Sequence, residues 1–310
     1  MAEIVISEFM NDAAVATLTA SHDVYYDPTL VERPAELRAQ VAGARALIVR
    51  NRTQVRGALL DAAPQLKVVG RLGVGLDNID TVACTARGIE VIPASGANVT
   101  SVAEYVIAGA LMLLRGAYQA TADVLAGEWP RTSLIGRELS GKVMGLVGFG
   151  AIAREVARRA TCLGVRTVAH DPMVATDDPV WKQLAVTPRA LAELLRESDV
   201  VSLHVPLSAD TRNLIDREAL ALMKPDAILI NAARGGVVDE AALANALRAG
   251  ALGGALLDVY ETEPLPRDSH LNNVPNLLLT PHIAGLTEES NERAGTLIAA
   301  RVGQILEKVP

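Results

Sequence analysis

Short apolar runs alternate with longer amphipathic segments from the start of the chain. Runs such as Ile4-Val5-Ile6 have the length and β-branched content of buried strands, and the segments between them repeat apolar residues at helical spacing. In the first third, strands are predicted at 4–6, 24–26, 47–49, 68–69 and 90–92, and helices near 12–20, 34–42, 57–63 and 80–87. This alternation is typical of a parallel sheet covered by helices.

A second alternating series begins after a long amphipathic helix, predicted from about Ser101 to Leu114. The segment Gly127-Glu128-Trp129-Pro130 predicts a loop or arm. Further strands are predicted near 143–148, 167–170, 199–204, 227–231, 254–257 and 277–280. The last helix, about Glu288 to Glu307, has one apolar face and no strand after it, so we expect it to pack on the first domain.

A glycine-rich turn, Gly148-Phe149-Gly150-Ala151-Ile152-Ala153, joins the strand at 143–148 to the next helix. Gly148 permits a tight turn, Gly150 lets a pyrophosphate approach the backbone, and Ala153 lets the helix pack closely on the strand. The N–H groups at the start of the helix would face the phosphates. Alone, this pattern also occurs as an ordinary strand–helix connection, but its setting between strand and helix favours a dinucleotide site.

The residue that ends the following strand supports the same interpretation. Asp171 can accept both hydroxyls of an adenosine ribose and would repel a 2′-phosphate, which favours NAD over NADP. Because the turn lies in mid-chain, we predict two doubly wound parallel-sheet α/β domains. A Rossmann cofactor domain, residues 98–285, is inserted into a flavodoxin-like substrate domain of residues 1–97 and 286–310, and we expect a cleft between them.

Composition and charge limit the classes of partner that the protein could bind. Hydrophobic residues make up 50% of the chain but aromatic residues only 3%, as suits parallel sheets covered by helices. The formal net charge of −7 argues against a nucleic-acid partner. No apolar run predicts a membrane span and the N-terminal segment has no signal pattern, so we expect a cytoplasmic protein. Cys84 and Cys162 lack metal-ligand spacing; we predict no metal site and expect both to be small core residues in a reducing compartment.

Three strand ends after the glycine turn carry candidate catalytic residues. Arg234 follows the strand at 228–231 with small neighbours, so its guanidinium could bind a carboxylate bidentately; the alternative is a surface loop arginine. Acidic residues including Glu263 follow the next strand, and His282 follows the last. A lone histidine is more often structural, whereas a histidine with a carboxylate partner can act as a general acid and base.

The chain resembles the D-2-hydroxyacid dehydrogenase family, which includes the 3-phosphoglycerate dehydrogenases. The resemblance covers nearly the whole chain. Besides the glycine turn, the matching segments are Arg50-Asn51-Arg52-Thr53, Gly73-Val74-Gly75-Leu76-Asp77-Asn78-Ile79-Asp80, Ser101-Val102-Ala103-Glu104, Ser202-Leu203-His204-Val205-Pro206-Leu207, Asn231-Ala232-Ala233-Arg234-Gly235, Asp258-Val259-Tyr260-Glu261-Thr262-Glu263-Pro264 and Thr280-Pro281-His282. Ala153 replaces the third glycine of the turn, a tolerated variant.

The resemblance implies that Arg234 binds the 2-oxo acid, Glu263 supports the imidazole, and His282 donates the proton. NADH would deliver hydride to the 2-oxo carbon, and domain closure would exclude water. Val74 and Gly75 would donate backbone N–H groups to the substrate carboxylate, although from the residues alone their turn could equally be structural. The cofactor contacts that we predict are Gly148, Gly150, Ala151, Ile152, Asp171, His204, Val205, Pro206, Thr211, Ala232, Asp258, which would hold the nicotinamide carboxamide, and His282.

The resemblance also implies a homodimer formed through the cofactor domains, with the arm near Trp129 reaching the partner subunit. Alternatively, Trp129 fills its own core. Some members of this fold are NADH-sensing corepressors, which would bind the cofactor without turnover. A formate dehydrogenase would be expected to carry a non-acidic residue where Glu263 stands.

Cations at strand ends of the first domain bear on the substrate. Arg50, Asn51 and Arg52 follow one predicted strand and Arg71 follows another, beside the Gly73-Val74-Gly75 turn. Arg234 and the amides of this turn can satisfy one carboxylate, so the spare arginines favour a substrate with a second anionic group, as in 3-phosphoglycerate or 3-sulfolactate. If they instead form surface ion pairs, the protein is expected to be a hydroxypyruvate or glyoxylate reductase.

Overall fold

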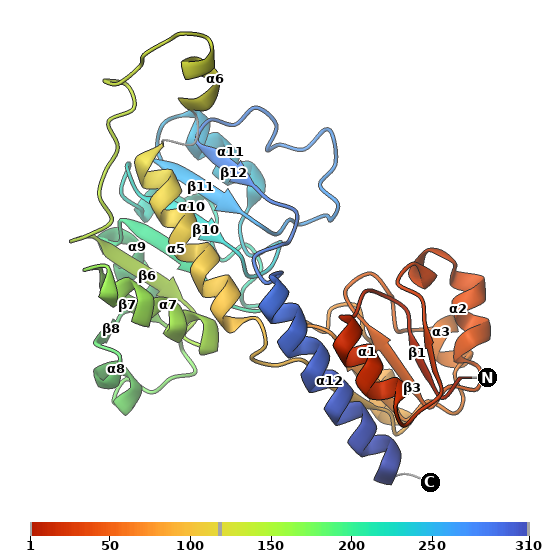
Figure 1. Ribbon diagram of the computed structural model, residues 1–310. Helices are drawn as coiled ribbons and strands as arrows, with labels where there is room; N and C mark the ends of the chain where they lie inside the picture. The colour runs from red at the N-terminus through yellow and green to blue at the C-terminus, as the bar shows by residue number, and fades with distance from the viewer. Residues whose placement is uncertain (1, 117–119, 309–310) are drawn as a thin grey trace. The chain divides into compact units, whose positions relative to one another are not determined.

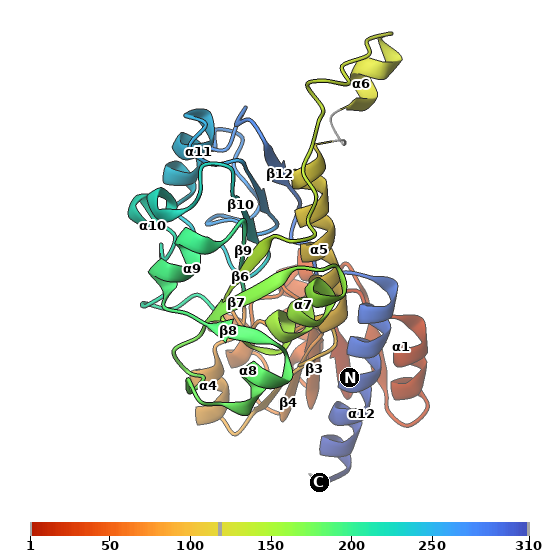
Figure 2. The ribbon, with the colours of Figure 1, turned by 90° about the vertical axis from the view of Figure 1, so that its left-hand side faces the viewer.

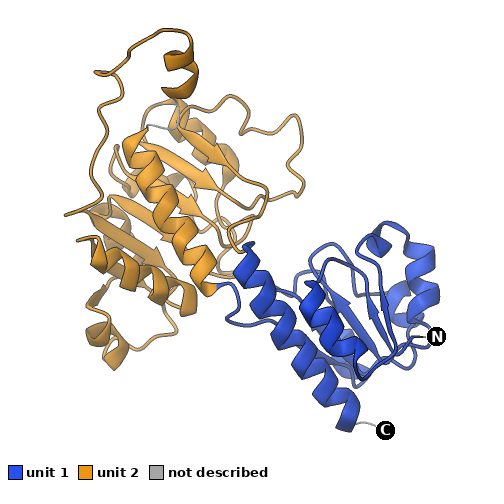
Figure 3. Ribbon diagram, in the orientation of Figure 1, with its two compact units in different colours: residues 1–98, 286–310 blue, residues 99–285 orange. Residues whose placement is uncertain are grey.

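The computed structural model describes residues 2–116 and 120–308. The chain divides into two compact units (Figure 3), unit 1 being Met1–Asn98 with Leu286–Pro310 and unit 2 being Val99–Gly285. Of the predicted domains, residues 1, 117–119 and 309–310 lie outside the described part of the chain. The substrate and cofactor roles given to the two domains stay predictions.

Unit 1 is built on a five-stranded parallel sheet within the described residues. Its strands are β1 (Ile4–Ile6), β2 (Val24–Tyr26), β3 (Ala46–Val49), β4 (Val68–Arg71) and β5 (Glu90–Pro93), in the order β2-β1-β3-β4-β5. This is the flavodoxin-like order, whose topological switch point lies between β1 and β3. The segments that leave the carboxyl ends of these two strands therefore border the place where such sheets bind ligands.

Helices cover both faces of this sheet (Figure 1). Helices α1 (Asp12–Thr19) and α12 (Glu288–Lys308) pack on one face. The other face carries the 3-10 helix η1 (Leu30–Glu32) and helices α2 (Pro34–Val41), α3 (Ala58–Asp61) and α4 (Thr81–Ala86). Ile298 and Val302 of α12 are fully buried against the sheet, which confirms that the last helix packs on the first domain.

Unit 2 is built on a seven-stranded parallel sheet within the described residues. Its strands are β6 (Val143–Val147), β7 (Arg166–His170), β8 (Val186–Pro188), β9 (Val200–Leu203), β10 (Ile228–Asn231), β11 (Gly254–Leu257) and β12 (Leu277–Leu279), in the order β12-β11-β10-β9-β6-β7-β8. This is the Rossmann order with a switch point between β6 and β9, and the predicted fold class is confirmed. β8 was not predicted because this edge strand is short and ends at a proline.

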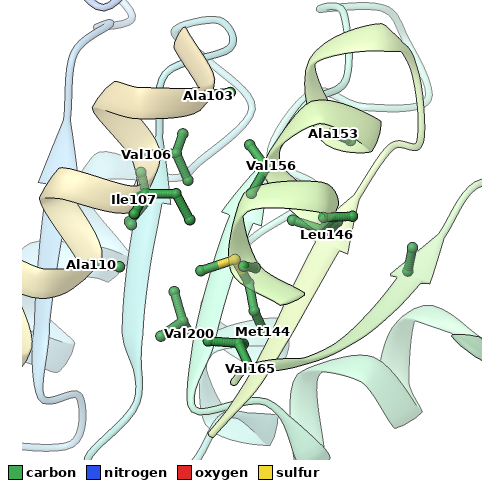
Figure 4. Packing of buried hydrophobic residues seen from close by; sticks show 14 of the residues in the cluster. Ala103, Val106, Ile107, Ala110, Met144, Leu146, Ala153, Val156, Val165 and Val200 are labelled. Atoms are coloured by element: carbon green, nitrogen blue, oxygen red, sulfur yellow. The ribbon is translucent and has the colours of Figure 1, made fainter. Parts of the chain in front are cut away.

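Helices α5 (Val99–Arg115) and α7 (Ala151–Cys162) pack on one face of the second sheet. Figure 4 shows Val106 and Ile107 of α5 and Val156 of α7 gathered over Met144 and Val200 of the sheet. Helices α9 (Leu191–Glu197), α10 (Arg217–Leu222) and α11 (Glu240–Arg248) cover the other face, and α8 (Pro179–Gln183) precedes β8. The core is aliphatic, as the composition predicts.

One sequence-based expectation is wrong and one alternative interpretation is excluded. Cys84 of α4 is buried as expected, but Cys162, the last residue of α7, is exposed because the helix ends at the surface there. Trp129 does not fill its own core, because its side chain is 74% exposed in the segment after α6 (Ala120–Leu125). Figure 2 shows this segment standing away from the sheet. None of the helices in residues 2–116 and 120–308 has the length and apolarity needed to cross a membrane.

Candidate active site

The glycine turn lies at the switch point of the second sheet. Gly148 has a φ of +89°, and a Cβ on it would lie 2.7 Å from the carbonyl oxygen of His204, which follows β9. Only glycine fits there. At Gly150, by contrast, a Cβ would meet no atom within 4 Å, so the backbone that opens α7 is accessible. Ala153 is fully buried under the turn. These residues fit a dinucleotide pyrophosphate, which needs close approach to a helix N-terminus.

An aromatic pair packs beneath the glycine turn in the core of unit 2. Phe149 is fully buried and stacks on Trp181 of α8, with ring centroids 4.5 Å apart. Arg154 donates from Nε to the carbonyl oxygen of Phe149 at 2.9 Å. The sequence reasoning missed Trp181, because the segment between β7 and β8 has no clear periodicity that would assign its face.

Asp171 faces the glycine turn from the end of β7. Its Oδ2 accepts the backbone N–H of Phe149 at 2.7 Å, and its Oδ1 accepts the N–H of Met173 at 2.8 Å. A carboxylate oxygen has two lone pairs, so Asp171 keeps acceptor capacity for ribose hydroxyls. The structure thus brings Asp171 to the turn, and its contact with the ribose stays a prediction.

The segment after β9 forms a closed loop beside the turn. His204 donates its N–H to the carbonyl oxygen of Val147 at 2.7 Å, and Thr211 Oγ1 donates to the carbonyl oxygen of Pro206 at 2.6 Å. Burial lowers the pKa of the His204 imidazole to about 4, so this ring is neutral near pH 7 and adds no charge to the phosphate region. The cofactor contacts of His204, Val205, Pro206 and Thr211, like those of Ala151 and Ile152 in α7, stay predictions.

The predicted catalytic pair is assembled within unit 2. Nδ1 of His282 lies 2.8 Å from Oε2 of Glu263, which leaves Nε2 as the ring nitrogen that can exchange a proton with a substrate. The second carboxylate oxygen of Glu263 accepts the N–H of Tyr260 at 3.1 Å. His282 itself has a φ of +56° and donates its N–H to the carbonyl oxygen of Asp258 at 2.8 Å. The backbone of the 258–264 segment therefore fixes both members of the pair.

A buried network anchors the loop that carries His282. The Asp258 side chain is 1% exposed, and its carboxylate accepts bonds from Thr280 Oγ1 and from the N–H groups of Ile283 and Ala284, at 2.6 to 2.8 Å. Tyr105 of α5 also hydrogen-bonds Thr280 Oγ1, and burial raises the pKa of this phenol to about 12, so it stays protonated. Asp258 thus positions the histidine loop, and the nicotinamide contact implied by the resemblance stays a prediction.

Arg234 lies in a loop held by the asparagine that ends β10. Asn231 donates from Nδ2 to the carbonyl oxygen of Arg234 at 2.9 Å, and its Oδ1 accepts the N–H of Ala233 at 3.1 Å. A Cβ on Gly235 would overlap the carbonyl oxygen of Tyr260, so the arginine loop packs backbone to backbone on the segment that leads to Glu263. Ala232 in the same loop is half-buried. Since β10, β11 and β12 are neighbours in the sheet, Arg234, Glu263 and His282 follow adjacent strand ends.

In unit 1 the segment 50–53 follows β3 at the switch point and is fixed by a buried carboxylate. Glu8, which is 4% exposed, accepts the backbone N–H groups of Arg50, Arg52 and Thr53 at 2.9 to 3.2 Å. Asn78 donates to the carbonyl oxygens of Arg50 and Thr53 at 3.0 and 2.7 Å. The sequence reasoning missed Glu8, although its place two residues after β1 was an available signal.

The strand-end arginines of unit 1 differ in their partners. Arg52 forms an exposed ion pair with Glu32 at 3.1 Å, as the alternative interpretation expects, and Arg71 donates to the carbonyl oxygen of Leu72 at 3.0 Å. The half-buried Arg50 instead donates from Nη2 to Oδ1 of Asn291 at 2.8 Å and lies 5.7 Å from the centre of the Phe9 ring. Within the described residues no carboxylate pairs with its guanidinium.

The remaining predicted substrate contacts lie in exposed turns. Asn51 and Val74 are exposed and Gly75 is half-buried. Among the described residues, no backbone carbonyl accepts the N–H groups of Val74 and Gly75, so both are available to a ligand. Their contact with a substrate carboxylate stays a prediction.

Comparisons with known proteins agree with these features. The family model for the NAD binding domain of D-isomer specific 2-hydroxyacid dehydrogenases matches residues 107–284. An (S)-sulfolactate dehydrogenase of Chromohalobacter salexigens is 57% identical over 99% of each chain. A D-3-phosphoglycerate dehydrogenase of Methanocaldococcus jannaschii is 38% identical over 99% of this chain but only 58% of its own length.

Among solved structures, the TT0316 protein of Thermus thermophilus is 35% identical with a TM-score of 0.90, covering 98% of this chain and 97% of that one. Sequence family, fold and the assembled histidine–glutamate pair point the same way. The chain therefore belongs to the D-isomer specific 2-hydroxyacid dehydrogenase family, and it is an NAD-dependent oxidoreductase that interconverts a 2-hydroxy acid and its 2-oxo acid.

Proposed function

We propose that the substrate carries a second anionic group, with 3-sulfolactate and its 2-oxo acid, sulfopyruvate, as the first candidates. The observation that carries this proposal is Arg50, a half-buried cation at the switch point of unit 1 that is held only by neutral groups among the described residues. Burial lowers the pKa of this guanidinium, yet arginine stays protonated near pH 7. A desolvated cation is stabilised by an anion, and a sulfonate supplies one.

The names of the relatives agree with a dianionic substrate, because sulfolactate and 3-phosphoglycerate both carry a charged group on C3. Their stereodescriptors are also compatible. In a sulfolactate the sulfur-bearing carbon outranks the carboxylate, whereas in a phosphoglycerate the carboxylate ranks higher. The same spatial arrangement at C2 is therefore named (S) in the first acid and D in the second. Sulfolactate is the first candidate because the relative with that name is 57% identical over 99% of the chain.

We assign the roles of the residues from the family resemblance, and their positions at the strand ends support the assignment. NADH, when bound at the glycine turn, supplies the hydride that reduces the 2-oxo carbon. Arg234 binds the carboxylate and carbonyl oxygen of the 2-oxo acid and stabilises the negative charge that develops on that oxygen. His282 donates a proton from Nε2, and Glu263 stabilises the protonated ring through Nδ1. Arg50 binds the group on C3.

A reduction panel tests the substrate proposal. Initial rates of NADH oxidation are measured with sulfopyruvate, 3-phosphohydroxypyruvate, hydroxypyruvate, glyoxylate and 2-oxoglutarate. We expect kcat/KM to be highest for sulfopyruvate, with 3-phosphohydroxypyruvate as the alternative among dianions. A higher kcat/KM for hydroxypyruvate or glyoxylate would show that the protein is a reductase of small monoanions.

Replacing Arg50 tests whether this residue binds the anionic group on C3. A hydrogen bond to a charged group contributes about 1.5–3 kcal/mol, so Arg50→Ala should lower kcat/KM for the dianionic substrate by about ten- to a hundredfold. The loss for glyoxylate, which has no group on C3, should be much smaller. Arg87→Ala, which removes an exposed cation of the same unit, is the matched control. Equal losses for both substrates would mean that Arg50 only shapes unit 1.

Cofactor preference is tested at Asp171. Asp171→Ala should lower the ratio of kcat/KM for NADH to that for NADPH by about tenfold or more, because it removes charge-assisted bonds to the ribose and the repulsion of a 2′-phosphate. The ratio is informative because the loss of the bond to Phe149 should affect both cofactors alike. A wild-type enzyme that already prefers NADPH would show that Asp171 does not select NAD.

We also propose a homodimer formed through unit 2. Several apolar side chains of this unit are exposed, among them Leu111 of α5, Trp129 at 74% and Ile135 at 78%. Apolar surface of this kind favours association. Analytical ultracentrifugation should show a dimer that Trp129→Ser with Ile135→Ser weakens, whereas Met173→Ser, at a similarly exposed site, should not. A monomeric wild type would exclude this interface.

The oxidation state of the two cysteines is relevant to the cellular compartment of the protein. Cys84 and Cys162 are both free, which fits a reducing compartment. We propose the cytoplasm, where NADH is available, and fractionation of the source cells with NADH-dependent activity as readout tests it.

A further inference from the structure

We propose that Asn291 is a positioning residue that sets substrate specificity. Its neutral amide orients Arg50 without neutralising the positive charge of the guanidinium, so that this charge can bind an anionic group of the substrate. This inference rests on the proposed role of Arg50. It concerns unit 1 alone, since Asn291 lies in the first turn of α12 and Arg50 follows β3.

The contact has a defined direction. An arginine side chain has only donors, so the amide oxygen of Asn291 must be the atom that faces Nη2, at 2.8 Å. Nη1 points to the carbonyl oxygen of Phe9 at 3.4 Å, and the guanidinium lies 5.7 Å from the centre of the Phe9 ring. The two hydrogen bonds to neutral oxygens and the contact with the Phe9 ring thus orient the guanidinium of Arg50. The five N–H donors of an arginine exceed these contacts, so some stay available to an anion.

The neutrality of Asn291 is informative because four other arginines of unit 1 pair with carboxylates, whereas Arg56, Arg71 and Arg293 donate to backbone carbonyl oxygens. Carboxylates pair with Arg33, Arg45, Arg52 and Arg87, through distances that identify ion pairs. Near Arg50 the one carboxylate that affects its titration is that of Glu8, which already accepts three backbone N–H groups. An amide at position 291 therefore orients the guanidinium of Arg50 without a negative charge that would compete with the substrate's anionic group.

Asn291→Asp is the decisive substitution, because it keeps the shape of the side chain and adds the missing charge. The carboxylate would pair with Arg50 and compete with the C3 anion. We expect the ratio of kcat/KM for sulfopyruvate to that for glyoxylate to fall about tenfold or more, mainly through KM for sulfopyruvate. We expect the Asn291→Asp variant to stay folded, since aspartate is favourable in the first turn of a helix.

The control and the double variant separate this mechanism from a general charge effect. Gln304→Glu adds the same charge at an exposed position of α12 and should leave the ratio unchanged. In an Arg50→Ala background, Asn291→Asp should lower the ratio no further. If it lowers the ratio equally with and without Arg50, the inference is wrong, because the carboxylate then acts on the substrate directly.

The single variants distinguish failure of the inference from failure of the proposed function. If Arg50→Ala lowers the ratio but Asn291→Asp does not, Arg50 binds the C3 anion and Asn291 does not control it. If neither substitution changes the ratio, the proposed role of Arg50 is wrong and the inference falls with it. Should the panel favour 3-phosphohydroxypyruvate, that substrate replaces sulfopyruvate in the same measurements.

Discussion

His282→Ala is expected to lower kcat for reduction of the 2-oxo acid by about 10²- to 10⁴-fold, the usual contribution of a positioned general acid. The reason is geometric. Glu263 bonds Nδ1 of the ring, so Nε2 is the remaining nitrogen that can deliver a proton, and alanine has none. NADH affinity, measured by equilibrium titration, should change much less than kcat, because His282 is one of many predicted cofactor contacts and the turn at Gly148 and Gly150 is built from other strand ends.

Two further variants give this prediction its controls. His270→Ala removes an exposed histidine of the same unit and should leave kcat unchanged. Glu263→Gln should lower kcat less than loss of the ring does, because the proton donor remains but the protonated imidazole loses the charge that stabilises it. A His282→Ala enzyme of wild-type activity would remove this residue from the mechanism. An unchanged kcat in Glu263→Gln would mean that the charge of the carboxylate does not contribute to proton transfer.

Arg234→Ala should lower kcat/KM for the 2-oxo acid by about 10²- to 10³-fold, comparable to the loss of one donor to a developing oxyanion. Its loop is fixed by Asn231 on one side and by close packing on the backbone of Tyr260 on the other. These contacts fix the backbone of Arg234, and its guanidinium donates from Nη1 to the carbonyl oxygen of Ala233 at 2.6 Å. Steady-state kinetics with saturating NADH measure the effect.

The chain offers a matched control for this arginine. Arg248 of α11 donates to the carbonyl oxygens of His270 and Asn272 at 2.9 and 3.0 Å, so Arg248→Ala removes from the same unit a cation that also bonds backbone carbonyl oxygens. It should leave kcat/KM unchanged. Arg234→Lys keeps the charge without the planar fork and should recover only part of the activity. A lysine variant as active as the wild type would show that bidentate binding is not required.

The architecture and much of the site could be predicted from sequence because both depend on local patterns. Apolar runs mark strands, and in a parallel sheet all carboxyl ends share one edge, so residues that follow strands gather there. Arg234, Glu263 and His282 are of this kind. The family resemblance implied that Glu263 supports the imidazole, and Oε2 of Glu263 lies 2.8 Å from Nδ1 of His282.

The residues that sequence reasoning missed depend on contacts between distant segments. Asn291 reaches Arg50 across 241 positions, and Tyr105 reaches Thr280 across 175. Glu8 follows a strand, but its function is to bind the backbone of another strand end. Nothing in the local pattern of α5 or α12 indicates these partners. The surface position of Cys162 was missed for a similar reason, since helical periodicity does not show where neighbouring elements end.

The stacking of Trp181 on Phe149 gives the protein an optical reporter of cofactor binding. The chain has two tryptophans, and the other, Trp129, is exposed in the segment after α6. In a Trp129→Phe variant, all tryptophan fluorescence would come from a ring 4.5 Å from the aromatic residue of the glycine turn. Reduced nicotinamide absorbs light at the wavelengths where tryptophan emits. Energy transfer from Trp181 would therefore follow NADH occupancy directly, before any substrate is added.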